Sequence, residues 1–130
     1  MKKAFKIVTN NPLVKETLEN EYHIEFVECS YEEILRKVRN YIYEGYELLT
    51  HPLSGSVKPN ETPYKSIMVS EKKEKLDPRS MEIIEYAIQS CKKFQFKSDK
   101  YAPEVYEDFQ VVDLKLIESA IFYKTESHTQ

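Results

Sequence analysis

The amino-acid sequence predicts an α/β domain of three layers: a mainly parallel sheet of about four strands, flanking helices and a helical carboxyl-terminal part. Short apolar runs alternate with segments of helical periodicity in the first half of the chain. Residues that cap helices or form turns separate these segments, and two longer segments with helical spacing make up the second half. Because alternating strands and helices favour right-handed parallel crossovers, we expect the strand order 2-1-3-4.

Local signals place the elements of the first half. Ala4–Thr9 is an apolar run that predicts the first strand, and Asn10-Asn11-Pro12 can cap and open a short helix. His23–Glu28 predicts the second strand. Ser30-Tyr31-Glu32-Glu33 has the pattern of a capping box, and the helix that it opens is expected to end at Gly45.

The remaining elements follow from apolar runs and prolines. Tyr46–Thr50 and Tyr64–Ser70 predict the third and fourth strands, and Asp77-Pro78 can open a helix. A long closing helix is expected from Pro103 to about Tyr123. Its expected buried residues are Val105, Phe109, Val112, Leu116 and Ala120.

Length and composition indicate one domain over residues 1–124 and a frayed tail over 125–130. The net charge of -3 and the lack of a long basic run argue against nucleic acid as a partner. No stretch approaches the roughly 18 apolar residues of a membrane span. The two cysteines form no CxxC pair and the three histidines show no metal-ligand spacing, so we expect a cytoplasmic protein without a metal or cofactor.

Two polar loops are the expected functional site. Open parallel sheets bind ligands beyond the carboxyl ends of their strands, where the strand order reverses. In the order 2-1-3-4 this point lies between strands one and three. The loops that leave these strands are Thr9–Pro12 and Thr50–Ser66, and we expect them to face each other across a shared pocket.

The second loop has a composition suited to anions. It contains three of the six prolines and one of the two glycines, so it is stiff, and Ser54-Gly55-Ser56 offers amides and hydroxyls that can wrap an anion. It matches neither GxxxxGK[ST] nor GxGxxG, so nucleotide binding is not indicated. The expected ligand-binding residues are Asn10, Asn11, Thr50, His51, Ser54, Gly55, Ser56, Lys58, Asn60 and Lys65.

Each of these features also has a structural interpretation. The long loop can cross the sheet edge and satisfy its own backbone groups, and Asn10 and Asn11 can act only as helix caps. His51 is either a hydrogen-bonding loop residue or a general base, which makes it a weak catalytic candidate. Cys29 is either an inert buried thiol or one with a pKa lowered by a helix amino terminus. The ten tyrosines suit half-buried packing as well as an interface.

The motifs Thr9-Asn10-Asn11-Pro12-Leu13-Val14 and Thr50–Ser66, with Val38-Arg39 between them, resemble the GrdX family over about residues 5–70. These are small proteins encoded alongside the glycine, sarcosine and betaine reductase components of anaerobic amino-acid-fermenting bacteria. The resemblance implies a cytoplasmic protein of that reductase system, whose substrates are small amino-acid-derived carboxylates. It supplies no catalytic residue.

Three functional hypotheses follow. The first is an accessory protein that binds a small carboxylate or phosphate through the two loops. The second is an assembly factor that uses the long loop or the tyrosines to contact subunits of the reductase complex. A second copy of the chain, in a homo-oligomer, is a further possible partner. The third is a small enzyme that uses His51 as acid or base.

Overall fold

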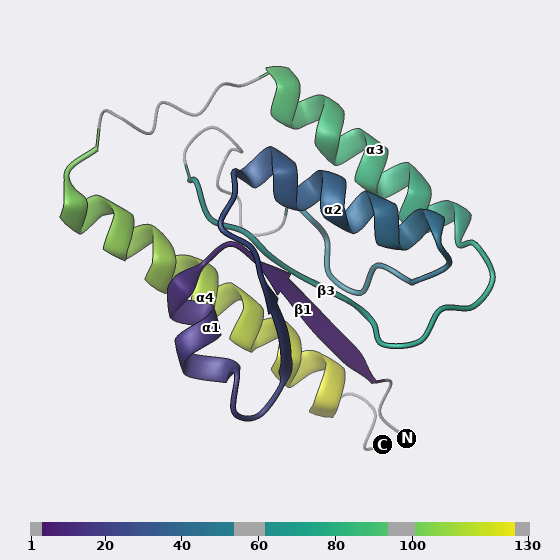
Figure 1. The fold of residues 1–130 in the computed structure, drawn as a ribbon, viewed down its shortest axis with the longest axis horizontal. Helices are drawn as coiled ribbons and strands as arrows, with labels where there is room; N and C mark the ends of the chain where they lie inside the picture. Colours follow the sequence, from purple (N-terminus) through teal and green to yellow (C-terminus); the bar gives the residue numbers. More distant parts are fainter. Residues whose placement is uncertain (1–3, 54–61, 94–100, 127–130) are drawn as a thin grey trace.

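A computed structural model of the chain describes residues 4–53, 62–93 and 101–126. Helices α2 and α3 cover one face of a central sheet, and α1 and α4 cover the other (Figure 1). The α/β class is therefore confirmed. The elements are β1 (Phe5–Thr9), α1 (Pro12–Leu18), β2 (His23–Phe26), α2 (Tyr31–Tyr43), β3 (Ser66–Ser70), α3 (Pro78–Lys93) and α4 (Pro103–Glu126).

The sheet is mixed, which differs from the mainly parallel sheet of four strands that the sequence predicts. Within the described residues it has three strands in the order β2-β1-β3, and β1 pairs with β2 in parallel but with β3 antiparallel. The expected third strand, Tyr46–Thr50, makes only an isolated antiparallel bridge between Leu48 and Val69. A parallel return needs a long crossover, usually a helix, and the proline-rich connection over 51–65 is unsuited to one.

The core lies on both faces of the sheet. In β1, Ile7 packs with Met68 against α1 and α4, whereas Val8 packs with Ile67 and Val69 against α2 and α3. All five side chains are fully buried. Successive residues of a strand point to opposite faces, so a strand that is apolar at consecutive positions needs a helical layer on each side.

The predicted helix boundaries of the first half are confirmed by their hydrogen bonds. The Asn11 side chain accepts a hydrogen bond from the Leu13 amide at 3.0 Å and caps α1. In the capping box of α2, the Glu33 amide donates to Ser30 Oγ at 3.1 Å and the Ser30 amide donates to Glu33 Oε1 at 3.2 Å. Gly45 follows α2 with a φ of 109°, a conformation that favours glycine.

Helix α4 buries a different set of positions from the set that its sequence predicts. The buried residues are Asp113, Leu114, Ile117 and Ile121. Val112, which the sequence predicts to be buried, is 45% exposed. Apolar side chains occur on several sides of α4, so their periodicity does not select one stripe. The helix ends at Glu126, and residues 127–130 of the expected tail lie outside the described residues. No described helix is both long and apolar enough to span a membrane.

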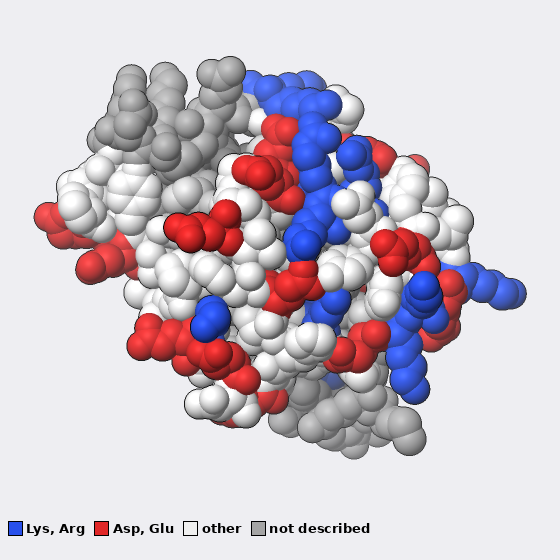
Figure 2. Space-filling view, viewed as in Figure 1, with Lys and Arg blue, Asp and Glu red and all other residues white. Residues whose placement is uncertain are grey.

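Charges of both signs are mixed on the outer face of α2 and α3. Figure 2 shows Lys and Arg side chains crossing this region with Asp and Glu side chains beside them. Two ion pairs belong to this surface: Arg36 with Glu32 at 2.8 Å and Arg39 with Glu85 at 3.4 Å. Neighbouring charges therefore compensate one another here.

Candidate functional site

A buried polar cluster occupies the carboxyl end of β1. Because β3 runs antiparallel to β1, Thr9 pairs with Ser66, and the loop after β1 meets the last residues of the long connection. The described parts of the two loops are in contact, through Asn10 with Pro63 and Lys65, and a ligand pocket shared between them stays a prediction. Six polar residues there are at most 5% exposed: Thr9, Asn10, Asn11, Lys65, Ser66 and Asp113. Ser54, Gly55, Ser56, Lys58 and Asn60, also predicted as ligands, lie outside the described residues.

Asn10 joins three segments of the chain. Its Nδ2 donates hydrogen bonds to the carbonyl oxygens of Cys29, at 2.9 Å, and Pro63, at 2.8 Å. Its Oδ1 accepts a hydrogen bond from the Lys65 amide at 2.9 Å. Both ends of the side-chain amide therefore bind the backbone. In this structure Asn10 fixes the loop after β1 against two other loops.

Asp113 connects α4 to the sheet end. Its carboxylate accepts hydrogen bonds from Asn11 Nδ2 at 3.0 Å, from the Ser66 amide at 3.1 Å and from Ser66 Oγ at 2.7 Å. Since the Ser66 hydroxyl donates to Asp113, the Thr9 hydroxyl must donate to Ser66 Oγ, 2.7 Å away. Asn11 Nδ2 also donates to the Gln110 carbonyl oxygen at 2.9 Å. The cluster is an ordered network in which Asp113 is the common acceptor.

Lys65 lies next to a small cavity. Burial lowers the pKa of its amine below the ordinary value, and the charge of Asp113 raises it in part. The cavity measures about 20 Å³ and is lined by Tyr31, Tyr64, Lys65 and Asp113 among others. That volume suits a single water molecule. The described contacts give the cluster a structural role, and a ligand role for Asn10, Asn11 and Lys65 stays a prediction.

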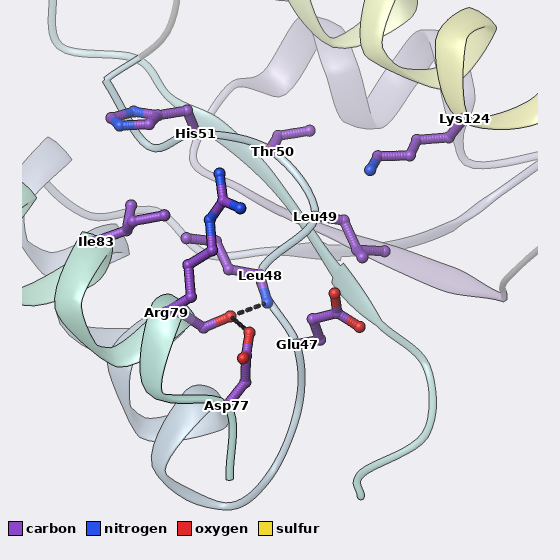
Figure 3. A pocket seen from close by; sticks show the side chains of 10 residues that line it. Glu47, Leu48, Leu49, Thr50, His51, Asp77, Arg79, Ile83 and Lys124 are labelled. Atoms are coloured by element: carbon purple, nitrogen blue, oxygen red, sulfur yellow. Dashed lines mark hydrogen bonds between the residues drawn. The ribbon is translucent and has the colours of Figure 1, made fainter. Parts of the chain in front are cut away.

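A larger groove lies at the edge of the sheet, beside the segment 46–50. Its volume is about 340 Å³, within the range of small-molecule sites. Two of the predicted residues, Thr50 and His51, line it. Arg79 and Lys124 line it as well, from α3 and α4 (Figure 3). The structure therefore divides those predicted ligand residues that it describes between the buried cluster and this groove.

Hydrogen bonds hold the walls of the groove in place. Ser80 Oγ donates to Asp77 Oδ2 at 2.6 Å and accepts from the Leu48 amide at 3.0 Å, which ties the start of α3 to the segment 46–50. Thr50 Oγ1 accepts from the Met68 amide at 3.0 Å. In Figure 3 the Arg79 guanidinium points toward His51 and Thr50. A basic side chain thus reaches the groove from a helix whose start is anchored.

His51 is oriented by the backbone. Its Nδ1 accepts a hydrogen bond from the Leu53 amide at 3.1 Å, so the neutral ring carries its proton on Nε2. Tyr31 holds the next turn to α2 by donating to the Pro52 carbonyl oxygen at 3.0 Å. Among the described residues, no carboxylate forms a hydrogen bond with His51. The catalytic role of His51 stays a prediction. If a His51→Ala variant kept its turnover, that prediction would be wrong.

The remaining candidates behave as packing residues. The pKa of the Cys29 thiol is raised by burial and by the nearby charge of Glu33, which favours the inert thiol of the two interpretations. The Tyr41 and Tyr46 rings pack edge to face with centroids 5.3 Å apart, and Lys6 Nζ lies 3.7 Å from the Tyr41 ring centroid. These tyrosines are half-buried packing groups.

Sequence reasoning missed four residues that matter in the structure: Glu47, Arg79, Asp113 and Lys124. For Asp113 a signal existed, because this acidic residue lies one helical turn from both Phe109 and Leu116, on a side of α4 that carries apolar residues. Arg79 and Lys124 are charged residues on helices, and charged residues are common on helix surfaces. No local pattern distinguishes them.

Comparison with known protein families gives a match that covers most of the chain. A family model described as GrdX-like protein matches residues 6–122. The match extends well past the resemblance over residues 5–70 and includes α3 and most of α4. No curated protein and no solved structure matches the chain.

Proposed function

The chain belongs to the GrdX-like family, and from this premise we propose that it is an accessory protein of the glycine, sarcosine and betaine reductase system that binds a small carboxylate or phosphate. The proposed site is the groove lined by His51, Arg79 and Lys124. One observation carries the proposal: these three side chains come from a loop, α3 and α4, yet line the same groove (Figure 3).

Four side chains of the groove, those of Thr50, His51, Arg79 and Lys124, suit an anion chemically, and Glu47 and Asp77 also line it. The Arg79 guanidinium can donate two parallel hydrogen bonds to a carboxylate or phosphate, and Lys124 adds a mobile positive charge. His51 offers its Nε2 proton, because Nδ1 is engaged by Leu53. The Thr50 hydroxyl accepts from Met68 and keeps its hydrogen to donate. Ser54, Gly55, Ser56, Lys58 and Asn60 stay in the proposal as predicted anion ligands.

The expected affinity is modest. The groove is open to solvent, where an ion pair contributes only about 0–1 kcal/mol. Even four such contacts at the upper limit of about 1 kcal/mol each correspond to a Kd of about 1 mM, so the expected Kd is about 1 mM or weaker.

A thermal-shift screen tests the proposal. Acetate, phosphate, acetyl phosphate, glycine, sarcosine and betaine are added to the intact protein, and a ligand at ten times its Kd should stabilise the native state by about 1.4 kcal/mol. The stabilisation should be lost in Arg79→Gln and in Lys124→Gln. The matched control is Lys92→Gln, an exposed lysine in the last turn of α3. If none of the six compounds stabilises the protein, the proposed function is wrong.

A second candidate function is assembly of the reductase complex. It is favoured by exposed aromatic side chains: Tyr86 is 65% exposed on α3, and Phe122 and Tyr123 are 63% and 72% exposed on α4. Large exposed aromatics are typical of protein interfaces. Co-purification with reductase subunits that is lost in a Phe122→Ser, Tyr123→Ser double variant would favour assembly over ligand binding.

A further inference from the structure

The groove runs beside a backbone segment that lies at the outer edge of β3. This segment, 46–50, is antiparallel to β3 and pairs with it on either side of Leu48. The carbonyl oxygen of the residue before Leu48 and the amide of the residue after it form hydrogen bonds with β3, both 2.9 Å long. The amide and carbonyl groups of Leu48 itself therefore point away from β3. They face the groove, because the Leu48 amide donates at 3.0 Å to the hydroxyl of Ser80, which lines it.

The Leu48 carbonyl oxygen is a main-chain acceptor on the groove side. Within the part of the chain that the structure describes, no group donates a hydrogen bond to it. An edge segment with such an acceptor can pair with an extended peptide, whose amide group supplies the donor. The groove therefore offers a hydrogen bond that a simple acid such as acetate cannot form.

A cationic side chain lies where the edge segment ends. In Figure 3 the Arg79 guanidinium points toward His51 and Thr50, which follow Leu48 in the chain, and Lys124 lines the same groove. A terminal carboxylate can bind there as the proposed function describes. In a strand parallel to the edge segment, the residue whose carboxylate lies beside Thr50 has its amide beside the Leu48 carbonyl oxygen. One terminal residue can therefore make both contacts.

A second cavity adjoins the groove in the other direction along the chain. Its volume is about 380 Å³, and Glu47 and Asp77 line both cavities. It is bounded by Gly45 and Leu76 among others, and Leu76, which is 53% exposed, gives it an apolar wall. An extended chain advances about 3.3 Å per residue, so about five residues would reach from the end of the edge segment into this second cavity. A small acid would fill one end only.

We infer that the groove binds the carboxyl-terminal segment of another polypeptide, in extended conformation and parallel to the edge segment. Its terminal carboxylate binds Arg79, and the amide group of its last residue donates to the Leu48 carbonyl oxygen. The residues before it enter the cavity beside Leu76. The inference rests on the proposed function of the groove, because it names the class of carboxylate that the same site takes. Small free acids bind the same end of the groove more weakly.

A series of ligands of increasing length tests the inference on the intact protein by isothermal titration calorimetry. The series is acetate, N-acetylalanine, N-acetyl-dialanine and N-acetyl-tetraalanine, each with a free carboxylate. Affinity should rise along the series, by about tenfold or more from acetate to the longest peptide, because each added residue gains main-chain contacts. A smaller rise overturns the inference but leaves anion binding intact, whereas absence of binding by all four compounds overturns both.

Two altered peptides test the two terminal contacts separately. The carboxyl-terminal amide of N-acetyl-tetraalanine lacks the carboxylate and should bind about ten times more weakly than the free acid. An analogue whose last peptide bond is an ester lacks the N–H group that donates to Leu48 and should bind about five times more weakly. Unchanged affinity of the ester would show that the peptide does not pair with the edge segment. Unchanged affinity of the amide would show that the chain end is not recognised. Either result overturns the inference.

A variant assigns the terminal carboxylate to Arg79. Arg79 is exposed, so Arg79→Gln is expected to fold. It should bind the free acid and the amide of N-acetyl-tetraalanine with affinities within about threefold of each other, because the group that distinguishes them has lost its partner. Lys92→Gln, in the last turn of α3, should keep the full difference. An Arg79→Gln protein that keeps a difference larger than threefold overturns the placement of the carboxylate.

Discussion

The Nδ2 atom of Asn11 lies 3.0 Å from Oδ2 of Asp113, a hydrogen bond that spans 102 positions of the sequence. The same Asn11 side chain caps α1, and the same Asp113 carboxylate binds Ser66 at the start of β3. One buried pair therefore joins α1, α4 and the sheet. This contact places α4, and with it Lys124, relative to the edge of the sheet.

Replacing Asp113 by alanine should destabilise the fold strongly. The change removes three hydrogen bonds to a buried carboxylate and leaves donors of Asn11 and Ser66 without their acceptor. The expected loss is about 2–4 kcal/mol in the free energy of unfolding, measured by urea denaturation. Asp108→Ala, at an exposed position of the same helix, should change it by less than about 0.5 kcal/mol. Equal stability of the two variants would show that the cluster contributes nothing.

Asn10→Ala should also destabilise the protein, by about 1–3 kcal/mol. The variant loses the hydrogen bonds to the carbonyl oxygens of Cys29 and Pro63. It also removes the Asn10 oxygen that accepts the hydrogen bond of the buried Lys65 amide. Chemical denaturation measures the loss, with Asn20→Ala, an exposed turn residue, as control. An unchanged midpoint in Asn10→Ala would mean that solvent replaces all three bonds.

Gly45→Ala tests a close approach of two backbone segments. Gly45 has a φ of 109°, and its carbonyl oxygen accepts a hydrogen bond from the Glu74 amide at 2.9 Å. A Cβ atom there would collide with the Glu74 carbonyl oxygen. The strain and the collision should together cost about 1–3 kcal/mol or more, seen as a lower Tm. The neighbouring exposed Glu44→Ala should leave the Tm nearly unchanged, and a comparable Tm for Gly45→Ala would contradict the described backbone.

The network around Glu25 predicts a dependence of stability on pH. Burial alone would raise the pKa of Glu25, but hydrogen bonds from Tyr41, Lys37 and Lys6 outweigh it and lower the pKa below the ordinary 4.5. A carboxyl group with a lowered pKa in the folded state stabilises the protein above its unfolded pKa, and this contribution is lost as the pH falls through the folded value. The difference in unfolding free energy between wild type and Glu25→Gln should be constant from about pH 6 to 8 and shrink below pH 4.5. A difference independent of pH would contradict the network.

Local signals predict the first half of the fold well. The cap at Asn11 and the capping box at Ser30 and Glu33 depend on residues within three positions of one another, so the sequence alone specifies them. The direction of β3 is different. All five of its residues are buried, so its pattern carries no information about orientation, and only the nature of the connection before it indicates an antiparallel return.

The candidate site is predicted only in part for the same reason. Thr50 and His51 stand at the end of an apolar run, and this position marks them as candidates. Arg79 and Lys124 reach the same groove only because α3 and α4 pack on opposite faces of the sheet. Such long-range placement depends on tertiary contacts like that of Asn11 with Asp113, which no local pattern contains.

Chemical-shift mapping of the ¹⁵N-labelled protein tests most directly whether the groove binds the ligand. Titration with the tightest-binding compound should shift the amide signals of Thr50, His51 and Arg79 and should leave α1 unaffected. Shifts confined to residues outside the groove, or no saturable shift at all, would contradict the account.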